Sequence, residues 1–301
     1  MMNYRTTTLV FSLICSSGVF ATSDDIAALT GKSAANPPSI GNFALPSPQQ
    51  PGPLLSFGQT LIGRNQWQLD YSTFSPYHVV GPFRNMNASM TFGLTDDTSV
   101  YFNVPVAADY RARSVHATAL KDVTLQLEHA VYTYGNQRYQ EQTTVVGAMT
   151  LPMEDVNLTK KITGYGSPSY FFGGTYNRTY VDWLFFASPG FWLTTTSDHL
   201  KIGSQWLYQA GLGHSICSVT DQSMLFGLLE MDGQYTYHDQ VFGMFRLNTG
   251  GNVVAFTPSL SLAFRHLITQ VGVGFPVIQD LNGNQTKTDY FIAANFIWTI
   301  T

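Results

Sequence analysis

The segment NMNASMTFGLTDDTSVYFNVPV, residues 85–106, holds two stretches of alternating apolar and polar side chains on either side of Asp96-Asp97. A period of two indicates a strand with one apolar and one polar face, and an Asp pair between two such runs indicates a tight turn. The segment therefore predicts a β-hairpin with one apolar face. Its apolar positions are Met86, Ala88, Met90, Phe92 and Leu94 before the turn and Val100, Phe102, Val104 and Val106 after it.

The same alternation recurs along the chain from Gln59 onward. It is clear in residues 64–71, 123–131, 200–212 and 290–301, and weaker near 142–151, 168–176, 181–193, 221–231, 252–264 and 267–277. With the hairpin, these segments make about twelve strands. An even number of antiparallel strands can close without a free edge, which is what the membrane core requires. The sequence predicts an all-β fold, a transmembrane antiparallel β-barrel of the bacterial outer-membrane type, over residues 59–301.

The connections between the expected strands alternate in length. Short ones are expected at Asp96-Asp97, Asn177-Arg178 and Arg265-His266, and longer ones at residues 108–117, 153–166, 233–251 and 279–286. Outer-membrane barrels have short periplasmic turns and longer external loops. This pattern therefore predicts that both ends of the barrel domain lie on the periplasmic side.

Composition excludes several other classes of protein. Charged residues make up 11% of the chain, and 15 basic against 19 acidic residues leave no surplus for binding nucleic acid. Two cysteines cannot form a disulfide framework or a Cys-rich metal site, and no apolar run reaches the ~18 residues of a spanning helix. We expect no cofactor and no metal.

Aromatic residues make up 14% of the chain, which fits the girdles at the two membrane boundaries. The alternative is a soluble β-sandwich with a large aromatic core, but such a domain normally carries more surface charge. The aromatic residues expected near strand ends are Tyr71, Phe74, Trp183, Phe191, Trp192 and Trp298.

The N-terminal residues 1–21 resemble a secretory signal, with Arg5, an apolar stretch and a cleavage site after Ala21. A lipid anchor at Cys15 is the alternative, and the bulky Ile14 argues against it. Residues 22–58 form a different kind of segment, too rich in proline for a helix or a central strand. We expect this segment to be a linker or a plug inside the barrel. Its prolines after residue 35 are Pro37, Pro38, Pro46, Pro48, Pro51 and Pro53.

The polar faces of the expected strands predict the lining of the lumen. The lining carries both signs of charge, which predicts no strong preference between ions. The pore-lining candidates are Arg64, Gln66, Asp70, Glu128, Lys201, Gln205, Gln209 and Asp289.

Several segments carry a family resemblance. They are Gly93-Leu94-Thr95-Asp96-Asp97, Gly166-Ser167-Pro168-Ser169-Tyr170, Glu230-Met231-Asp232-Gly233, Asn248-Thr249-Gly250-Gly251-Asn252, Phe256-Thr257-Pro258-Ser259-Leu260, Val273-Gly274-Phe275-Pro276-Val277 and Gln279-Asp280-Leu281-Asn282-Gly283.

Their order resembles the outer-membrane transporter family of the MetA-pathway of phenol degradation, over most of residues 59–301. The family motif residues are Glu230, Gly233, Pro258 and Pro276. The resemblance implies a channel for small molecules, hydrophobic or aromatic ones included, with outer-membrane lipid and the barrel assembly machinery as partners. The chain departs from such barrels by ending on Thr301 in place of an aromatic residue.

Catalytic patterns are weak. The sequence contains neither a G-x-S-x-G elbow nor an H-E-x-x-H helix. His214 and Ser215 are adjacent and therefore point to opposite faces of a strand. The sequence favours a passive outer-membrane channel over an enzyme, and the alternatives are a phospholipase-like hydrolase of the outer membrane and a structural surface protein.

Overall fold

The computed structural model describes residues 40–77, 84–112, 115–153, 166–220 and 223–300. The expected signal segment 1–21, the first part of the Pro-rich segment and Thr301 lie outside the described residues. Among the described residues, none of the helices has the length and apolar character needed to cross a membrane.

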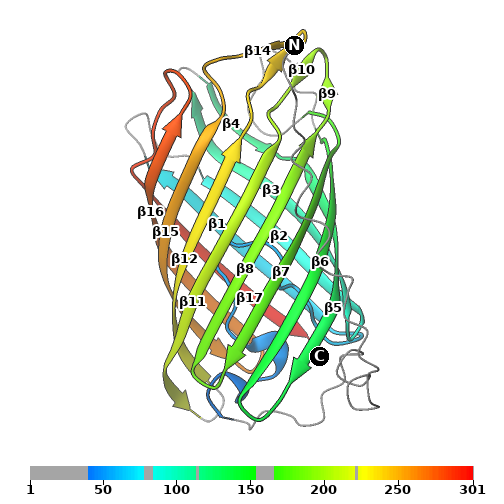
Figure 1. The fold of residues 1–301 in the computed structure, drawn as a ribbon, viewed down its shortest axis with the longest axis vertical. Helices are drawn as coiled ribbons and strands as arrows, with labels where there is room; N and C mark the ends of the chain where they lie inside the picture. Colours follow the sequence, from blue (N-terminus) through cyan, green and yellow to red (C-terminus); the bar gives the residue numbers. More distant parts are fainter. Residues whose placement is uncertain (1–39, 78–83, 113–114, 154–165, 221–222, 301) are drawn as a thin grey trace, which may run out of the picture.

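The described strands form a closed antiparallel barrel of twelve strands, as the alternation predicts (Figure 1). Closure follows from the pairing, because β2 contacts both β1 and β3, and β1 pairs with the final strand β17. The wall strands are β1 (Trp67–Tyr77), β2 (Arg84–Thr95), β3 (Thr98–Ala112), β5 (Val123–Gly135), β6 (Tyr139–Leu151), β7 (Ser169–Tyr180), β8 (Trp183–Thr194), β11 (Gln205–Thr220), β12 (Ser223–Thr236), β15 (Gly251–Phe264), β16 (Leu267–Leu281) and β17 (Tyr290–Ile300).

Short additional strands lie beyond the wall. β4 (Val115–Leu120) precedes β5 and pairs with the upper part of β3. A separate four-stranded sheet is built from two connections, at the upper end in Figure 1. Its strands are β9 (Thr196–Ser197), β10 (Leu200–Lys201), β13 (Gln240–Val241) and β14 (Met244–Phe245).

The lengths of the connections alternate around the described barrel. The hairpin of residues 85–106 turns at Asp96-Asp97, between Thr95 and its partner Thr98. A short turn also occurs at Arg265-His266, as expected, but Asn177-Arg178 lies within β7 and the turn is at Val181-Asp182. The sequence interpretation missed this because the polar pair lies on a strand end. The end with the short turns also holds the end of β17, and we take it as periplasmic.

The two faces of the wall have opposite character. On β5, Leu125 and Leu127 are exposed on the outer surface, whereas Gln126 and Glu128 are buried in the interior. Apolar residues outside and polar residues inside are the arrangement of a barrel that spans a membrane. The structure contradicts the girdle expectation at Phe74 and Trp192: both occupy inward positions, where they pack on other aromatic rings. Their partners are Phe291 and Phe171, with ring centroids 4.8 Å and 5.0 Å away.

The last strand follows the predicted register, with Asn295 and Thr299 buried inside. Two apolar residues on its polar side have partners within the barrel. Ile297 packs against an inward cluster that contains Leu45 of the N-terminal segment. Phe291 lies so close to Gly274 that any side chain at the glycine would collide with the ring.

Candidate functional site: the occupied lumen

Residues 41–62 lie inside the barrel, toward the end that carries the short turns (Figure 1). We call this stretch the inner segment. It contains two short 3-10 helices, η1 (Gly41–Phe43) and η2 (Ser47–Gln49), and otherwise has an irregular backbone. Irregular backbone is compatible with this depth in a membrane protein only where the barrel supplies hydrogen-bond partners.

The inner segment begins at the β7–β8 turn. The backbone N–H of Asn42 donates to the Val181 carbonyl at 2.6 Å, and its side-chain amide donates to the carbonyls of Tyr180 and Trp183. Farther along, the Gln49 amide donates to the Thr299 hydroxyl on β17. The segment therefore crosses the lumen between opposite parts of the wall.

Glu230 on β12 binds the middle of the inner segment. Its two carboxylate oxygens accept the backbone N–H groups of Leu54, Leu55 and Ser56, and Oε2 also accepts the Ser56 hydroxyl at 3.2 Å. Successive N–H groups that converge on one anion make a strong site, because each bond is charge-assisted. Asp232, two residues along the same face, contacts the Ser56 hydroxyl at 3.5 Å.

Glu128 on β5 binds the next part of the segment. Its carboxylate accepts the N–H of Gln59 at 2.9 Å and the N–H of Thr60 at 2.8 Å, together with the Thr60 hydroxyl at 2.6 Å. Glu128 and Glu230 are both completely buried. A buried carboxylate is costly unless hydrogen bonds satisfy it, so the two glutamates and the inner segment stabilise each other.

Neutral polar side chains complete the attachment. The Gln209 carbonyl oxygen accepts the Phe57 N–H at 3.1 Å, the Gln270 amide donates to the Gly52 carbonyl at 2.9 Å, and the Asn295 amide donates to the Leu54 carbonyl at 3.1 Å. Phe57 itself packs against Phe171, with ring centroids 4.6 Å apart. The segment is thus held on several sides by contacts far apart in sequence.

A cavity of about 350 Å³ remains beside the inner segment. Its wall comes mainly from β1, β2, β16 and β17, and Asp70 is the carboxylate among its lining side chains. The Asp70 side chain accepts a hydrogen bond from Ser89 at 3.2 Å. The cavity is therefore weakly charged and of mixed polarity. Its wall side chains are Gln68, Asp70, Ser72, Thr73, Phe74, Asn87, Thr91, Tyr101, Gln126, Ile268, Gln270, Ala293, Asn295 and Ile297.

A smaller cavity of about 90 Å³ lies between the inner segment and the β6–β8 wall. Gln50 and Leu61 border it from the segment, and Gln140, Gln142 and Asn177 border it from the wall. The inner segment therefore does not fill the lumen completely.

The structure distributes the pore-lining candidates over different places. Asp70 borders the larger cavity, and Glu128 and Gln209 bind the inner segment. Gln205 lies on β11 four residues before Gln209 and therefore on the same face of the strand. Four candidates lie outside the wall strands, contrary to the expected lining. Arg64 and Gln66 precede β1 near the β2–β3 turn, Lys201 belongs to β10, and Asp289 is exposed before β17.

These four were placed in the lumen because the alternation was extended past the ends of the strands. Arg64 shows the physical reason, since its backbone N–H donates to Asp96 at 3.1 Å and its side chain is exposed. Strand periodicity sets no direction once the chain turns. The alternation thus applies only within the paired residues.

The four family motif residues have different roles. Glu230 holds the inner segment, as described above. Gly233 lies beneath the Tyr208 ring, which a side chain at that position would strike. Pro258 is exposed on the outer face of β15, and Pro276 follows Phe275 at a bulge where β15 and β16 shift register. The sequence analysis did not place Glu230 in the lumen, although its spacing of two residues from Asp232 on one strand face is a signal that could have placed it there.

The groups considered for catalysis lie apart from this site. His214 packs against Trp183 on the outer surface, with ring centroids 4.3 Å apart, and Ser215 contacts Asp182 at 3.4 Å. In the part of the chain that the structure describes, no cluster of three His, Cys, Asp or Glu side chains has an arrangement that holds a metal ion.

Comparisons with solved structures place the chain among outer-membrane β-barrels. An outer membrane channel from Pseudomonas putida F1 has a TM-score of 0.59 at 12% identity, over 83% of this chain and 99% of that one. LpxR from Salmonella typhimurium has a TM-score of 0.43 at 8% identity, over 77% and 99%. The β domain of the Bordetella autotransporter BrkA has a TM-score of 0.44 at 10% identity, over 78% and 98%.

No protein-family model matches the sequence, and curated protein sequences give no match. At 12% identity the similarity to the Pseudomonas putida channel establishes the fold alone, an outer-membrane type of β-barrel. Function has to be argued from the site.

Proposed function

We propose that the protein is a channel of the bacterial outer membrane that binds small uncharged molecules in its lumen and passes them by diffusion. Hydrophobic and aromatic solutes belong to the proposed range. The proposal includes export through the signal in residues 1–21, cleavage after Ala21, insertion by the barrel assembly machinery, and membership of the family of the MetA-pathway of phenol degradation. The similarity to the Pseudomonas putida channel supports the proposal by analogy.

The cavity of about 350 Å³ is the observation that carries the proposal. Sites for small molecules have volumes of roughly 300–1,000 Å³, so this cavity suits a solute of about one ring. Phe74 and Ile297 offer apolar surface, and the amide groups of Gln68 and Asn87 supply polar groups in the same lining. A neutral molecule with one polar group matches this lining better than an ion does.

The test is current block in planar bilayers that contain the refolded protein. A neutral monocyclic alcohol or phenol should block the ionic current in a concentration-dependent way, whereas its carboxylate analogue and a disaccharide should not. Ser72→Phe fills the cavity and should abolish the block. Ala294→Phe is the matched control, because it adds the same ring at nearly the same height but on the outer face.

Equal block by all three solutes would contradict the proposed selectivity. Absence of any conductance, together with release of fatty acid from phospholipid by the same preparation, would replace the channel with the hydrolase alternative. In the proposed mechanism the wall and the inner segment bind and release solute, and no covalent step occurs.

A further inference from the structure

A cluster of tyrosines surrounds one ion pair on the outer surface of the barrel, where β5, β6 and β7 approach the short turns. Its members are Tyr132, Tyr134, Tyr139, Glu141, Tyr176, Arg178 and Tyr180. The register places them on one face, since Glu141 pairs with both Tyr134 and Arg178, and Tyr139 pairs with Tyr180. The residues between them on β6 and β7 point inward and border the smaller cavity of about 90 Å³; they are Gln140, Gln142, Asn177 and Thr179. The cluster therefore faces the surroundings of the barrel.

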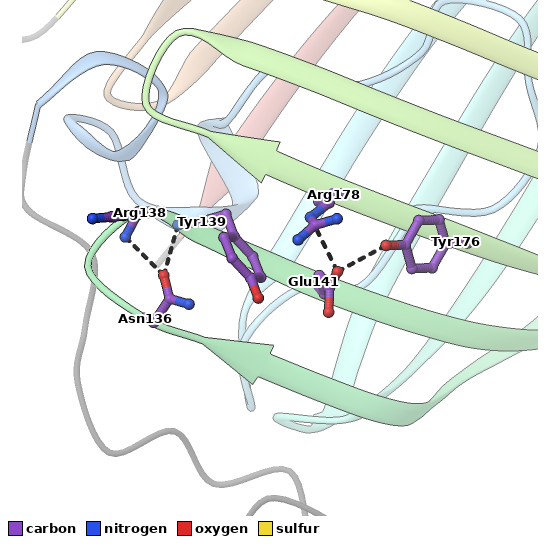
Figure 2. A network of polar contacts seen from close by, with 6 residues as sticks. All are labelled: Asn136, Arg138, Tyr139, Glu141, Tyr176 and Arg178. Atoms are coloured by element: carbon purple, nitrogen blue, oxygen red, sulfur yellow. Dashed lines mark hydrogen bonds and ion pairs between the residues drawn. The ribbon is translucent and has the colours of Figure 1, made fainter.

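The ion pair is held in a defined geometry (Figure 2). Arg178 Nε lies 3.1 Å from Glu141 Oε1, and the Tyr176 hydroxyl donates to the same oxygen at 2.9 Å. The Arg178 guanidinium lies over the Tyr139 ring, 4.2 Å from its centroid, and 5.3 Å from the Tyr180 centroid. A guanidinium stacked in this way loses little further freedom when it binds an anion.

Both groups remain accessible to a ligand. The Arg178 side chain is 34% exposed and the Glu141 side chain is 15% exposed. The two described contacts of the carboxylate use Oε1, so Oε2 is the oxygen that a donor from outside would meet. A cationic group and an anionic group are thus presented side by side on an aromatic surface.

The height of the cluster corresponds to lipid headgroups. The β5–β6 turn ends at Tyr139, whose N–H donates to Asn136 at 3.0 Å, and this turn is on the periplasmic side. Val145 and Phe172, farther along the same face, are exposed apolar residues. A strand rise of ~3.3 Å and a tilt of ~40° put Glu141 about 10 Å below Val145 along the membrane normal. Aromatic girdles flank the apolar band of such barrels at the membrane boundary, and the ion pair lies within a group of tyrosines at this end of the wall.

Stability does not account for this arrangement. An exposed ion pair contributes only ~0–1 kcal/mol, and a girdle of tyrosines alone needs no charged pair. Phosphate is bound best by a guanidinium, and a primary ammonium is bound by a carboxylate and by tyrosine faces. We propose that the cluster is a binding site for a zwitterionic phospholipid headgroup of the phosphatidylethanolamine type in the periplasmic leaflet. Arg178 binds the phosphate, Glu141 and the tyrosines bind the ammonium, and the acyl chains lie along Val145 and Phe172.

The continuous apolar wall above the cluster favours a lipid over a periplasmic protein. A protein partner would leave Val145 and Phe172 in contact with bulk lipid, whereas a bound lipid covers the charged and the apolar surfaces together. The proposal requires only that the barrel is embedded in a membrane, and it is independent of which solute the lumen carries.

The experiment is native mass spectrometry of the delipidated full-length protein in detergent, titrated separately with phosphatidylethanolamine, phosphatidylcholine and phosphatidylglycerol of equal chain length. The wild type should bind phosphatidylethanolamine about tenfold more tightly than phosphatidylglycerol, the factor for one charge-assisted hydrogen bond gained or lost. Phosphatidylcholine should fall between them, because its quaternary ammonium fits the tyrosines but cannot donate to Glu141.

Two variants separate the roles of the charges. Arg178→Gln should weaken binding of all three lipids by about tenfold. Glu141→Gln should remove the preference for phosphatidylethanolamine over phosphatidylglycerol while phosphate binding persists. The matched control is Arg265→Gln, which removes one exposed positive charge at the β15–β16 turn and should leave the lipid affinities unchanged. Heat-modifiable mobility in gels verifies that each variant is folded.

Equal affinity of the wild type for phosphatidylethanolamine and phosphatidylglycerol would overturn the proposal. It would also be overturned if Arg178→Gln bound the lipids with the affinity of the wild type. The same holds if the barrel bound an added periplasmic protein through the cluster and bound none of the three lipids there. A rank order that follows Arg178 and Glu141 as described supports it.

Discussion

The attachment of the inner segment to Glu230 predicts the effect of replacing that carboxylate. In Glu230→Gln, the side chain keeps one acceptor oxygen and gains an amide donor. The best orientation keeps the oxygen toward Leu55 and Ser56, with three hydrogen bonds, and turns the amide toward the Leu54 N–H. The Leu54 donor then faces another donor.

The expected cost combines two opposing effects. One unsatisfied donor costs about 1–3 kcal/mol, and three charge-assisted bonds become weaker neutral ones. The variant also avoids dehydration of a carboxylate when the segment docks, a penalty of several kcal/mol in the wild type. We expect docking to weaken by about 2 kcal/mol, which raises the population of the undocked segment roughly 30-fold.

The assay is thiol labelling of the inner segment in proteoliposomes. Gly52→Cys serves as the probe, since a Cβ at Gly52 meets no atom within 4 Å, in a chain that starts at residue 22 and carries Cys217→Ser. Labelling by a membrane-impermeant reagent should accelerate with Glu230→Gln, and single-channel openings should become more frequent.

Asp70→Asn is the control for this assay. Asp70 is also a lumen carboxylate, but its hydrogen-bond partner is Ser89 of the wall and not the inner segment. The same change of charge should therefore leave labelling within about twofold of the wild type. If Glu230→Gln labels at the wild-type rate while the barrel remains folded, the carboxylate does not control docking and the reasoning fails.

Three further predictions concern the barrel wall and the Pro-rich segment. Ala294→Arg puts a charge on the lipid face and should lower the free energy of unfolding by about 2–4 kcal/mol. Ser72→Arg puts the same charge beside the cavity and should lower it much less. Equal losses of unfolding free energy in denaturant titrations would refute the assigned faces. Gly274→Val forces a side chain into the Phe291 ring and should cost about 1–3 kcal/mol, and a wild-type unfolding midpoint would contradict that contact. Deletion of residues 22–58 should raise bilayer conductance with heat-modifiable mobility retained, and unchanged conductance would show that this segment does not limit flow.

Asn295 shows a limit of what the alternation predicts about the lumen. The alternation alone suggests that a charge at residue 295 would be tolerated, because the lumen of a barrel holds water. Asn295 is instead buried against the inner segment, where its amide donates to Leu54 and to Gln270. A tolerated lumen charge therefore has to be placed at Ser72, where a cavity remains.

The alternation of apolar and polar residues is enough to predict the barrel. Strand periodicity is a local property, readable in segments such as 85–106, and it predicted about twelve strands, their outer and inner faces and two of the three short turns named above. It failed at strand ends, as at Arg64 and Lys201, because a chain that leaves the ladder no longer alternates. It also assigned Phe74 and Trp192 to the girdle, because closeness to a strand end does not show whether the side chain is on the outer or the inner face of the wall.

The contents of the lumen depend on contacts between residues far apart in the sequence, which appear only in the folded barrel. Glu230 meets Leu54 across 176 residues of sequence, and Glu128 meets Gln59 across 69. The Pro-rich composition of the inner segment excludes regular structure but encodes no partner, and the glutamates alone resemble ordinary lining residues. Their pairing arises because closure of the wall brings distant polar faces around one enclosed volume, where buried N–H groups and carboxylates must find partners.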